Sequence, residues 1–503
     1  MKKTPILLTY LLPQPRDILF IGVLFSMLFG GPKLLSNDGD LGRHITIGNY
    51  ILETGTIPTR DIFSHTLYGE RLVPHEWLAQ VIFALAHRAM GLSGDVFIAA
   101  LLGAFTILIV YEELIKRGNF RLVALFIAAG VTIVASVHWL ARPHMFTFFF
   151  VALWTYGLEH SYKNGLKSIW LFPLLMLIWV NTHGAFIAGF VIWGTFMADW
   201  LWEFVQGRGT KLMGARLFSI GLLSLAVTFI NPSGWYLWGT SVGYVSNNFM
   251  TSHTVEYLSP DFHERDMWPF MFMVAFALFA LVQERSQLHV REALLLSGWT
   301  VLGLYSVRNL PLFAVVTAPI YGALIQPWAE KMLNGLQPAS SVRESGNVLR
   351  GYVWVVVAVL FFGSILWRGI PIDQKGTGNI FLPNKMPVQA VDWLEANPQA
   401  GKMFNHFIWG GYILYRMWPA ELVFIDGQTD FYGEALFREY LDVINLSAGW
   451  ENILDKHAVS WMIIPNRERL SEYLKSGQDR AWNVIYEDDT AVIFRRDAGK
   501  ATP

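Results

Sequence analysis

Residues 37–77, which determine how the rest of the chain is interpreted, read NDGDLGRHITIGNYILETGTIPTRDIFSHTLYGERLVPHEW. One apolar segment precedes this stretch, and a long series of apolar segments follows it. The stretch itself carries Asp38, Asp40, Arg43-His44, Asp61 and His75-Glu76. Ionisable groups are rare beside a lipid bilayer unless they have a role there. We therefore predict that this loop is the working face of a membrane enzyme.

The composition supports the membrane class and removes several others. The chain has 503 residues, of which 53% are hydrophobic and only 15% are charged. Its mean hydropathy is +0.37, whereas a soluble chain is typically about 25% charged. The net charge of −1 provides no field that would attract nucleic acid, so no nucleic-acid partner is expected. The absence of cysteine excludes disulfides, thiolate catalysis and cysteine–metal sites.

The apolar runs predict a polytopic α-helical membrane protein with about eleven transmembrane helices, since a crossing needs about 20 apolar residues. The expected positions are 16–34, 95–114, 121–141, 144–161, 168–182, 184–205, 215–231, 267–284, 291–307, 309–327 and 351–367. Residues 77–92 form a shorter run that contains His87 and Arg88, so they are expected to form an interfacial helix.

Lysine and arginine are more frequent in alternate loops of this pattern, which predicts a cytoplasmic N-terminus in the cytoplasmic membrane. Basic residues such as Lys2, Lys3, Arg343 and Arg350 fall on the inner side. An odd number of spans then places residues 368–503 outside the cytoplasm. The same topology places most of the polar motifs on the outer side, namely Asp38, Asp40, His44, His75, Glu76, Arg142, His144, Glu256 and Arg308.

The chain is expected to contain two domains. Residues 1–367 would form the transmembrane domain, including the first outer loop at 35–94, and residues 368–503 an extracytoplasmic α/β domain. In this tail, short apolar segments alternate with helical patterns. Strands are predicted within 402–407, 421–426, 461–465 and 491–496, and helices within 388–397, 433–444 and 467–476.

Asp40 is the strongest candidate for a catalytic residue. An acid at a membrane boundary can hold a divalent cation against a phosphate, or accept a proton from an acceptor. The structural alternative is that Asp38 and Asp40 cap a helix that starts near Leu41, because aspartate is a favoured N-cap. The catalytic candidates on this loop are Asp40, Asp38, His44, His75 and Glu76.

The run Asp40-Leu-Gly-Arg-His44, followed by Gly55-Thr-Ile-Pro58, resembles the first outer loop of the GT-C glycosyltransferases. It is most similar to the catalytic subunit of oligosaccharyltransferase, a relative of the protein O-mannosyltransferases and the aminoarabinose transferases. These enzymes take sugar from a polyprenyl-phosphate carrier on the non-cytoplasmic face. The resemblance implies a GT-C-like helical domain and a catalytic or metal-binding role for Asp40.

Two further stretches extend the resemblance and also depart from it. Arg142-Pro-His144 lies where the oligosaccharyltransferase family places a second acidic motif. Thr254-Val-Glu256 is similar to a Thr-x-x-Glu element of the family with one residue fewer. The resemblance implies a divalent cation, Mg²⁺ or Mn²⁺, held by Asp40, His144 and Glu256. Because this stretch offers a histidine where the family has acids, a metal-independent mechanism stays open, and Glu256 can equally be a solvated surface residue.

In the tail, Trp409-Gly-Gly-Tyr412 resembles the Trp-Trp-Asp-Tyr-Gly motif with which the family recognises an acceptor sequon. The aspartate of that motif is missing, so recognition of an asparagine sequon cannot be carried over. The two glycines alternatively form a tight turn before a helix.

Arg142 and Arg308 are candidates to hold the donor phosphate, because a guanidinium matches phosphate oxygens. Each alone is equally well explained as a boundary residue whose charge reaches the interface. His75-Glu76 and Asn181-Thr-His183 would orient a sugar or ligate metal, or alternatively cap helices and pair with arginine.

These patterns predict transfer of a sugar or oligosaccharide from a polyprenyl-(di)phosphate donor to a protein, lipid or glycan acceptor at the outer face. One alternative is a polysaccharide polymerase or ligase that relies on the outer arginines. Another is a non-catalytic assembly or scaffold protein. A transporter is disfavoured, because transport sites lie near the middle of the bilayer and these charges lie at the ends of the predicted spans.

Overall fold

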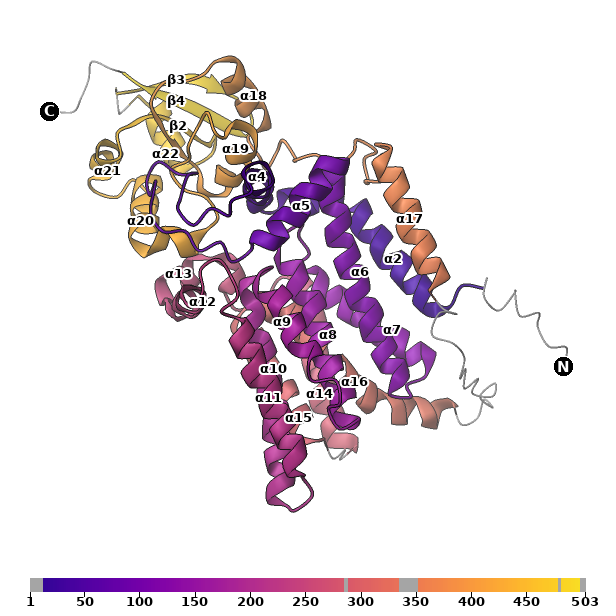
Figure 1. Ribbon diagram of the computed structural model, residues 1–503. Helices are drawn as coiled ribbons and strands as arrows, with labels where there is room; N and C mark the ends of the chain where they lie inside the picture. Colours follow the sequence, from indigo (N-terminus) through magenta and orange to yellow (C-terminus); the bar gives the residue numbers. More distant parts are fainter. Residues whose placement is uncertain (1–11, 285–287, 334–351, 478–480, 498–503) are drawn as a thin grey trace.

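The computed structural model describes residues 12–284, 288–333, 352–477 and 481–497, and it consists of a helical bundle with an α/β unit at one end (Figure 1). A helix lies at each of the eleven positions predicted to span the membrane. They are α2 (Pro15–Phe29), α6 (Leu92–Lys116), α7 (Arg121–Ser136), α8 (His144–Lys163), α9 (Leu171–Val180), α10 (Ile187–Val205), α11 (Lys211–Val227), α14 (Trp268–Glu284), α15 (Val290–Tyr305), α16 (Leu310–Leu333) and α17 (Val353–Trp367). Lys2, Lys3, Arg343 and Arg350, which contributed to the predicted orientation, lie outside the described residues.

Within the described residues, four helical segments are long and apolar enough to cross a membrane: Leu92–Lys116, Gly184–Val205, Arg265–Val282 and Val307–Met332. Shorter apolar helices are Arg121–Ser136, Leu171–Val180 and Val353–Trp367. The first and last of the four are buried over 67% and 78% of their most apolar windows, whereas Arg265–Val282 is buried over only 17%. Helices α6 and α16 therefore form the centre of the bundle, and α14 presents apolar side chains such as Phe272 and Leu278 outward. An apolar outer surface of this kind suits lipid.

Three further helices lie on the side of the bundle that faces the α/β unit. They are α3 (Gly31–Ser36), at the end of the first predicted span, and the two helices of the first loop, α4 (Asp40–Thr54) and α5 (Trp77–Met90). Helix α4 packs against α5, and α5 packs against α6. The helix predicted at 77–92 is thus present. His87 and Arg88 take separate partners, since His87 Nδ1 lies 2.7 Å from Asp95 Oδ2 and Arg88 pairs with Glu53.

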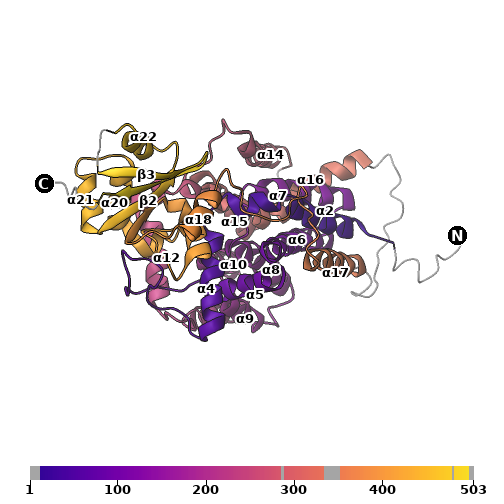
Figure 2. The same cartoon turned by 90° about the horizontal axis from the view of Figure 1, so that it is seen from above.

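The C-terminal unit, α18 to β4, contains a four-stranded sheet in the order β1-β2-β4-β3. Strands β1 and β2 are parallel, and the other two pairs are antiparallel. Its elements are α18 (Val388–Ala396), β1 (Lys402–Asn405), α19 (Gly410–Met417), α20 (Thr429–Ile444), α21 (Trp450–Lys456), β2 (Val459–Pro465), α22 (Arg469–Lys475), β3 (Trp482–Glu487) and β4 (Ala491–Arg496). Figure 2 shows this unit beside the helices when the molecule is seen from above.

Side chains alternate across the sheet, as the period of a strand requires. Trp461 and Ile463 join the core shared with the helical bundle, whereas Met462 and Ile464 pack into a second core with Phe437 of α20. Both faces of β2 are therefore buried, which explains its almost continuous apolar sequence. One face connects the C-terminal unit to the bundle.

The prediction of a strand at 421–426 is wrong, and residues 482–487 form an unpredicted strand. The 421–426 segment is extended, but it is joined to the first loop rather than to the sheet. Val423 N–H donates to the Phe63 carbonyl at 3.1 Å, and His65 N–H donates to the Val423 carbonyl at 3.0 Å. Asn405 adds side-chain bonds to the backbone of 424–425. These contacts use the backbone groups that a sheet would otherwise pair.

Candidate active site

The start of α4 is the point at which the first loop meets the C-terminal unit. Helix α19 packs across this end of α4. A Cβ atom at Gly39 would clash with the Ile408 carbonyl, and one at Gly411 would clash with the Gly39 carbonyl. Glycine at these positions therefore permits direct backbone contact. Trp409-Gly-Gly-Tyr412, the stretch that resembles the family's sequon-recognition motif, thus lies against the N-terminal end of α4, where Asp40 is the first residue.

The first cluster of charges surrounds the guanidinium of Arg142, just before α8. Its Nη1 contacts Asp38 Oδ2, and its Nη2 lies 2.5 Å from Asp40 Oδ2. Asp38 Oδ1 also accepts a 2.8 Å hydrogen bond from the Asp40 N–H. Asp38 thus binds the first N–H of α4, but the N-cap residue is Gly39, so neither acid is the N-cap that the structural alternative proposed. The Asp40 carboxylate contacts Arg142 instead, and its other side is covered by Gly427, where a Cβ atom would clash with Asp40 Oδ1.

Glu256 joins this cluster from the short helix η2 (Val255–Tyr257). Its carboxylate lies 3.1 Å from Arg308 Nη1, 3.4 Å from His138 Nε2 and 3.9 Å from Arg142 Nη1. Glu256 is thus held between two arginines, and the alternative of a solvated surface residue is wrong. Burial would raise its pKa, but Arg308, Arg142 and His138 outweigh burial and lower the pKa of Glu256 to about 2.

A second cluster is centred on Glu76, which precedes α5. His183 Nε2 lies 3.6 Å from its carboxylate, His44 Nδ1 lies 3.7 Å away and His75 Nε2 lies 3.9 Å away. These separations are longer than hydrogen bonds. Burial raises the pKa of Glu76, so its neutral form is favoured relative to an exposed glutamate.

The orientation of His183 is fixed by α8 and by the start of the next helix. Its Nδ1 lies 2.9 Å from Thr147 Oγ1 and accepts a 3.2 Å bond from the Ala185 N–H. Nε2 is the atom that faces Glu76, and it also lies 3.4 Å from Arg308 Nη2, whose N–H groups can only donate. Burial lowers the pKa of His183 well below its usual value, which keeps the ring neutral.

His44 and Gln80 leave polar atoms unused beside Glu76. Gln80 Nε2 lies 3.3 Å from His44 Nδ1. Among the described residues, the buried atoms His44 Nε2 and Gln80 Oε1 have no hydrogen-bond partner. A buried polar atom without a partner is destabilising, so each such atom calls for an explanation, and binding of a ligand is one.

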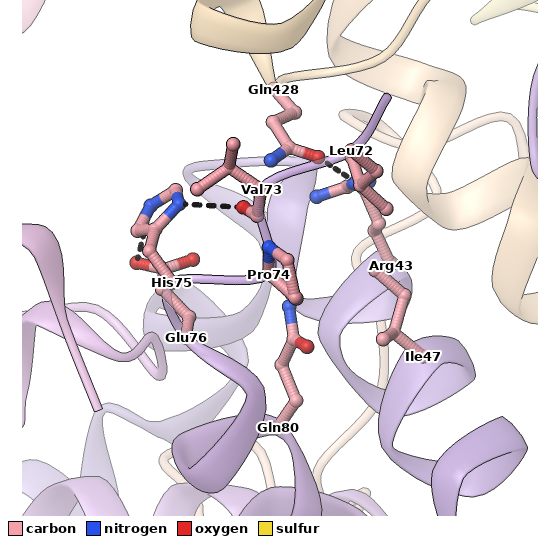
Figure 3. Close-up of a pocket in the computed structure, with 9 residues that line it drawn as sticks. All are labelled: Arg43, Ile47, Leu72, Val73, Pro74, His75, Glu76, Gln80 and Gln428. Atoms are coloured by element: carbon pink, nitrogen blue, oxygen red, sulfur yellow. Dashed lines mark hydrogen bonds and ion pairs between the residues drawn. The ribbon is translucent and has the colours of Figure 1, made fainter. Parts of the chain in front are cut away.

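A small pocket opens between α4, the loop before α5 and the C-terminal unit. In Figure 3, Gln428 points toward Arg43 on one side of this pocket, and His75 and Glu76 lie on the other side. Gln80 and residues 72–74 complete the lining. The pocket combines one permanent cation, two titratable groups and two amides, which suits a polar ligand.

All predicted site residues meet in this region. Asp38, Asp40, Arg142, Arg308 and Glu256 form the first cluster, and His44, His75 and Glu76 form the second. His144 lies beside both, with its ring 4.7 Å from that of His138 and 6.4 Å from that of His183. The catalytic and phosphate-binding roles of these residues stay predictions.

Sequence reasoning missed the contribution of the segment at 426–430. Arg43 Nε lies 3.1 Å from Asp426 Oδ2, both side chains are buried, and Arg43 Nη2 also contacts Gln428. Asp430 Oδ2 lies 3.8 Å from His75 Nδ1. The sequence feature that could have indicated this segment is the polar run directly after the apolar residues 423–425. The sequence does not show, however, that this run faces Asp40 and Glu76.

A divalent cation on Asp40, His144 and Glu256 stays a prediction. Within the parts of the chain that the structure describes, no group of three or more histidine and acidic side chains is placed to hold a metal ion. Arg142 lies between the two acids of the predicted set, and His144 Nε2 lies 2.9 Å from the His138 carbonyl. The residues as arranged therefore do not fit that cation.

Comparisons with known proteins complete the description. No protein-family model matches the sequence, and no curated protein matches it. The structure is similar to the archaeal oligosaccharyltransferase AglB of Archaeoglobus fulgidus in complex with an inhibitory peptide and a dolichol-phosphate. That match has a TM-score of 0.60 and 13% identity over 96% of this chain and 75% of the other.

Two further structures give the same result. The Archaeoglobus fulgidus oligosaccharyltransferase tethered to an acceptor peptide matches with a TM-score of 0.53 and 14% identity, over 89% of this chain and 69% of the other. The apo form of ArnT from Cupriavidus metallidurans matches with a TM-score of 0.50 and 14% identity, over 97% and 98% of the two chains. The protein therefore has the fold of the GT-C membrane glycosyltransferases, as the resemblance of its first loop implied.

Proposed function

We propose that this protein is a glycosyltransferase that moves a sugar or oligosaccharide from a polyprenyl-(di)phosphate donor to an acceptor. The observation that carries the proposal is the position of Asp40. In a GT-C fold, this acid lies where the first loop, the start of α8 and the C-terminal unit meet, and two clusters of charged and titratable side chains adjoin it. Neighbouring structures with a bound dolichol-phosphate or acceptor peptide support a lipid-linked donor and a separate acceptor.

In the proposed reaction, a nucleophilic oxygen or nitrogen of the acceptor forms a bond to the anomeric carbon of the donor sugar. The bond between that carbon and the phosphate oxygen breaks, and the phosphate leaves with the bonding electron pair. Asp40 takes the proton of the acceptor, which is the role of a general base. Arg308, with Arg142 behind it, stabilises the negative charge that develops on the leaving phosphate.

Glu76 and its three histidines would hold the sugar and relay its protons. The Nε2 atom of His183 faces this centre, and Arg43, Gln80 and Gln428 line the pocket beside it, where they would contact hydroxyl groups. The segment 426–430 covers both Asp40 and His75, so the C-terminal unit would shape access for the acceptor.

The proposed topology keeps the eleven spans, the cytoplasmic N-terminus and the C-terminal unit outside the cytoplasm. The position of the α/β unit at the end of the bundle that carries the two clusters supports this arrangement (Figure 1). The carrier chain would then lie along the apolar helices, with its phosphate at their outer ends.

The test compares cells that carry wild-type protein, Asp40→Asn, Arg308→Ala or Glu53→Gln at matched abundance. Glu53 is an exposed acid on the same helix and serves as the control. Glycans released from membrane and envelope fractions would be analysed by mass spectrometry. We expect one product to disappear with Asp40→Asn and to persist with Glu53→Gln. An unchanged profile with a folded Asp40→Asn protein would contradict the proposal and favour a scaffold, whereas loss with Arg308→Ala alone would favour the arginine-dependent polymerase or ligase.

A further inference from the structure

The guanidinium of Arg142 lies among three carboxylates that come from two segments of the chain. Asp38 lies in the turn before α4 and Asp40 begins that helix, whereas Glu256 belongs to η2. Nη1 contacts Asp38 and lies 3.9 Å from Glu256, and Nη2 lies 2.5 Å from Asp40. One cation thus faces all three acids.

The backbone of Arg142 is fixed, so the guanidinium is held at this place. The Arg142 N–H donates to the Leu140 carbonyl at 2.9 Å, and the Ala141 N–H donates to the Leu34 carbonyl at 3.1 Å. The Met145 N–H donates to the Arg142 carbonyl at 3.2 Å as α8 begins. The side chain is only 18% exposed. These contacts join Arg142 both to α3 and to α8.

Carboxylate oxygens are the ligands that a hard divalent cation such as Mg²⁺ or Mn²⁺ prefers. Among the described residues no three acids or histidines are placed to hold such an ion as they stand, so these three carboxylates would have to close in on it once the guanidinium is removed. A guanidinium can neutralise the same carboxylates without a metal. Its planar N–H groups bind two carboxylates at once, and its charge is permanent. The two cations are mutually exclusive, since the guanidinium lies between the oxygens that a metal would need to approach.

We propose that Arg142 is the built-in cation of this site. Its guanidinium occupies the place among Asp38, Asp40 and Glu256 that a divalent ion would otherwise take, and it positions the Asp40 carboxylate. The catalytic part of this proposal, that Arg142 positions Asp40 for reaction, rests on the proposed glycosyl transfer. The structural part, that Arg142 occupies the place of a cation among the three carboxylates, does not. Arg142 therefore acts through Asp40 as a positioning residue. Arg308 remains the arginine on the other side of Glu256.

The test measures cation binding to the purified full-length protein in detergent, with Mn²⁺ alone as the probe. Loss of the free Mn²⁺ signal in electron paramagnetic resonance gives the stoichiometry and affinity. The variants are Arg142→Ala, Arg142→Gln as the milder removal of charge, Arg142→Lys as the conservative change, and Arg142→Ala combined with Asp40→Asn. A merely structural arginine would not alter Mn²⁺ binding when it is replaced.

We expect no specific Mn²⁺ site in the wild type or in Arg142→Lys. Arg142→Ala and Arg142→Gln should gain one site per chain with an affinity at least about tenfold higher than that of the wild type, since three carboxylates are released to the ion. Adding Asp40→Asn should remove this gain.

Two outcomes would overturn the inference: one Mn²⁺ bound specifically by the wild type, or no gain in folded Arg142→Ala and Arg142→Gln. The wild-type titration decides the first outcome even if a variant fails to fold. An unchanged glycan profile with Asp40→Asn would contradict the glycosyl transfer without affecting the Mn²⁺ result, so the two failures are distinguishable.

Discussion

The helical bundle carries buried charges at both ends, and the two groups are built differently. At the end away from the C-terminal unit, Arg291 binds Glu159 through Nε and Nη2 at 3.1 Å each and Asp199 through Nη1 at 2.8 Å. Its backbone N–H also donates to Asp199 at 3.2 Å. At the site end, the contacts around Glu76 are 3.6 Å or longer, and His44 Nε2 lacks a partner among the described residues.

Helix α8 connects the two ends, since it begins at His144 and carries Glu159 about 22 Å further along its axis. The network around Arg291 satisfies its hydrogen bonds and joins α8, α10 and α15. The cluster around Glu76 leaves donors and acceptors unused beside a pocket. Complete satisfaction suits a structural connection, whereas unused polar atoms suit a site that binds a ligand.

The largest expected effect is on stability at the Arg291 end. Arg291→Met should destabilise the protein by about 3 kcal/mol, because Asp199 would remain buried without its arginine, while Glu159 would still be paired with Arg117 and Lys163. The thermal unfolding midpoint of the protein purified in detergent would measure this change. Arg208→Met is the matched control, because it likewise removes the arginine of an ion pair, with Glu203, but that pair lies at the surface. Equal midpoints for the two variants would show that the Arg291 network is not structural.

The next effect should appear at the site end and in activity instead of stability. Glu76→Gln should lower formation of the glycan product about 100-fold, or about 2.7 kcal/mol, if Glu76 exchanges a proton during transfer. The unfolding midpoint should stay unchanged or rise, because burial already disfavours the charged form and glutamine resembles the neutral one. A fall in the midpoint as large as that of Arg291→Met would remove the distinction between the two ends.

The smallest effect is a dependence of stability on pH that comes from Asp38. Burial is the main cause that raises the pKa of Asp38 to about 7. Between its usual pKa of 3.8 and about 7, the folded state keeps a proton that the unfolded state has released. Stability from this group should therefore fall as the pH rises through this range, and stay constant above it.

The slope should be at most about 1 kcal/mol per pH unit, because Asp38 is partly exposed and its charge is screened. Asp38→Asn should remove the slope, and Glu53→Gln should retain it. Unfolding midpoints at about pH 5 and about pH 8 would measure both variants. A wild-type midpoint that does not change over this range would contradict the prediction.

The sequence by itself predicted the membrane class, a helix at each of the expected positions and the importance of the first loop. Long apolar runs and helical periodicity are local properties, so they can be read without knowledge of the fold. The stretch at 77–92 and the helices of the tail follow the same rule. The segment at 421–426 does not, because an apolar run is compatible with a strand until its backbone finds other partners in the first loop.

Only the tertiary structure decided how the site is assembled. Asp426 and Gln428 contact Arg43 although they lie 383 and 385 positions further along the chain. No local pattern of the sequence predicts these contacts. The sequence likewise offered Arg142 as a phosphate ligand, a boundary residue or a departure from an acidic motif. Its place among Asp38, Asp40 and Glu256 depends on where three separate segments end, because charge pairing is set by distance in space and not by spacing along the chain.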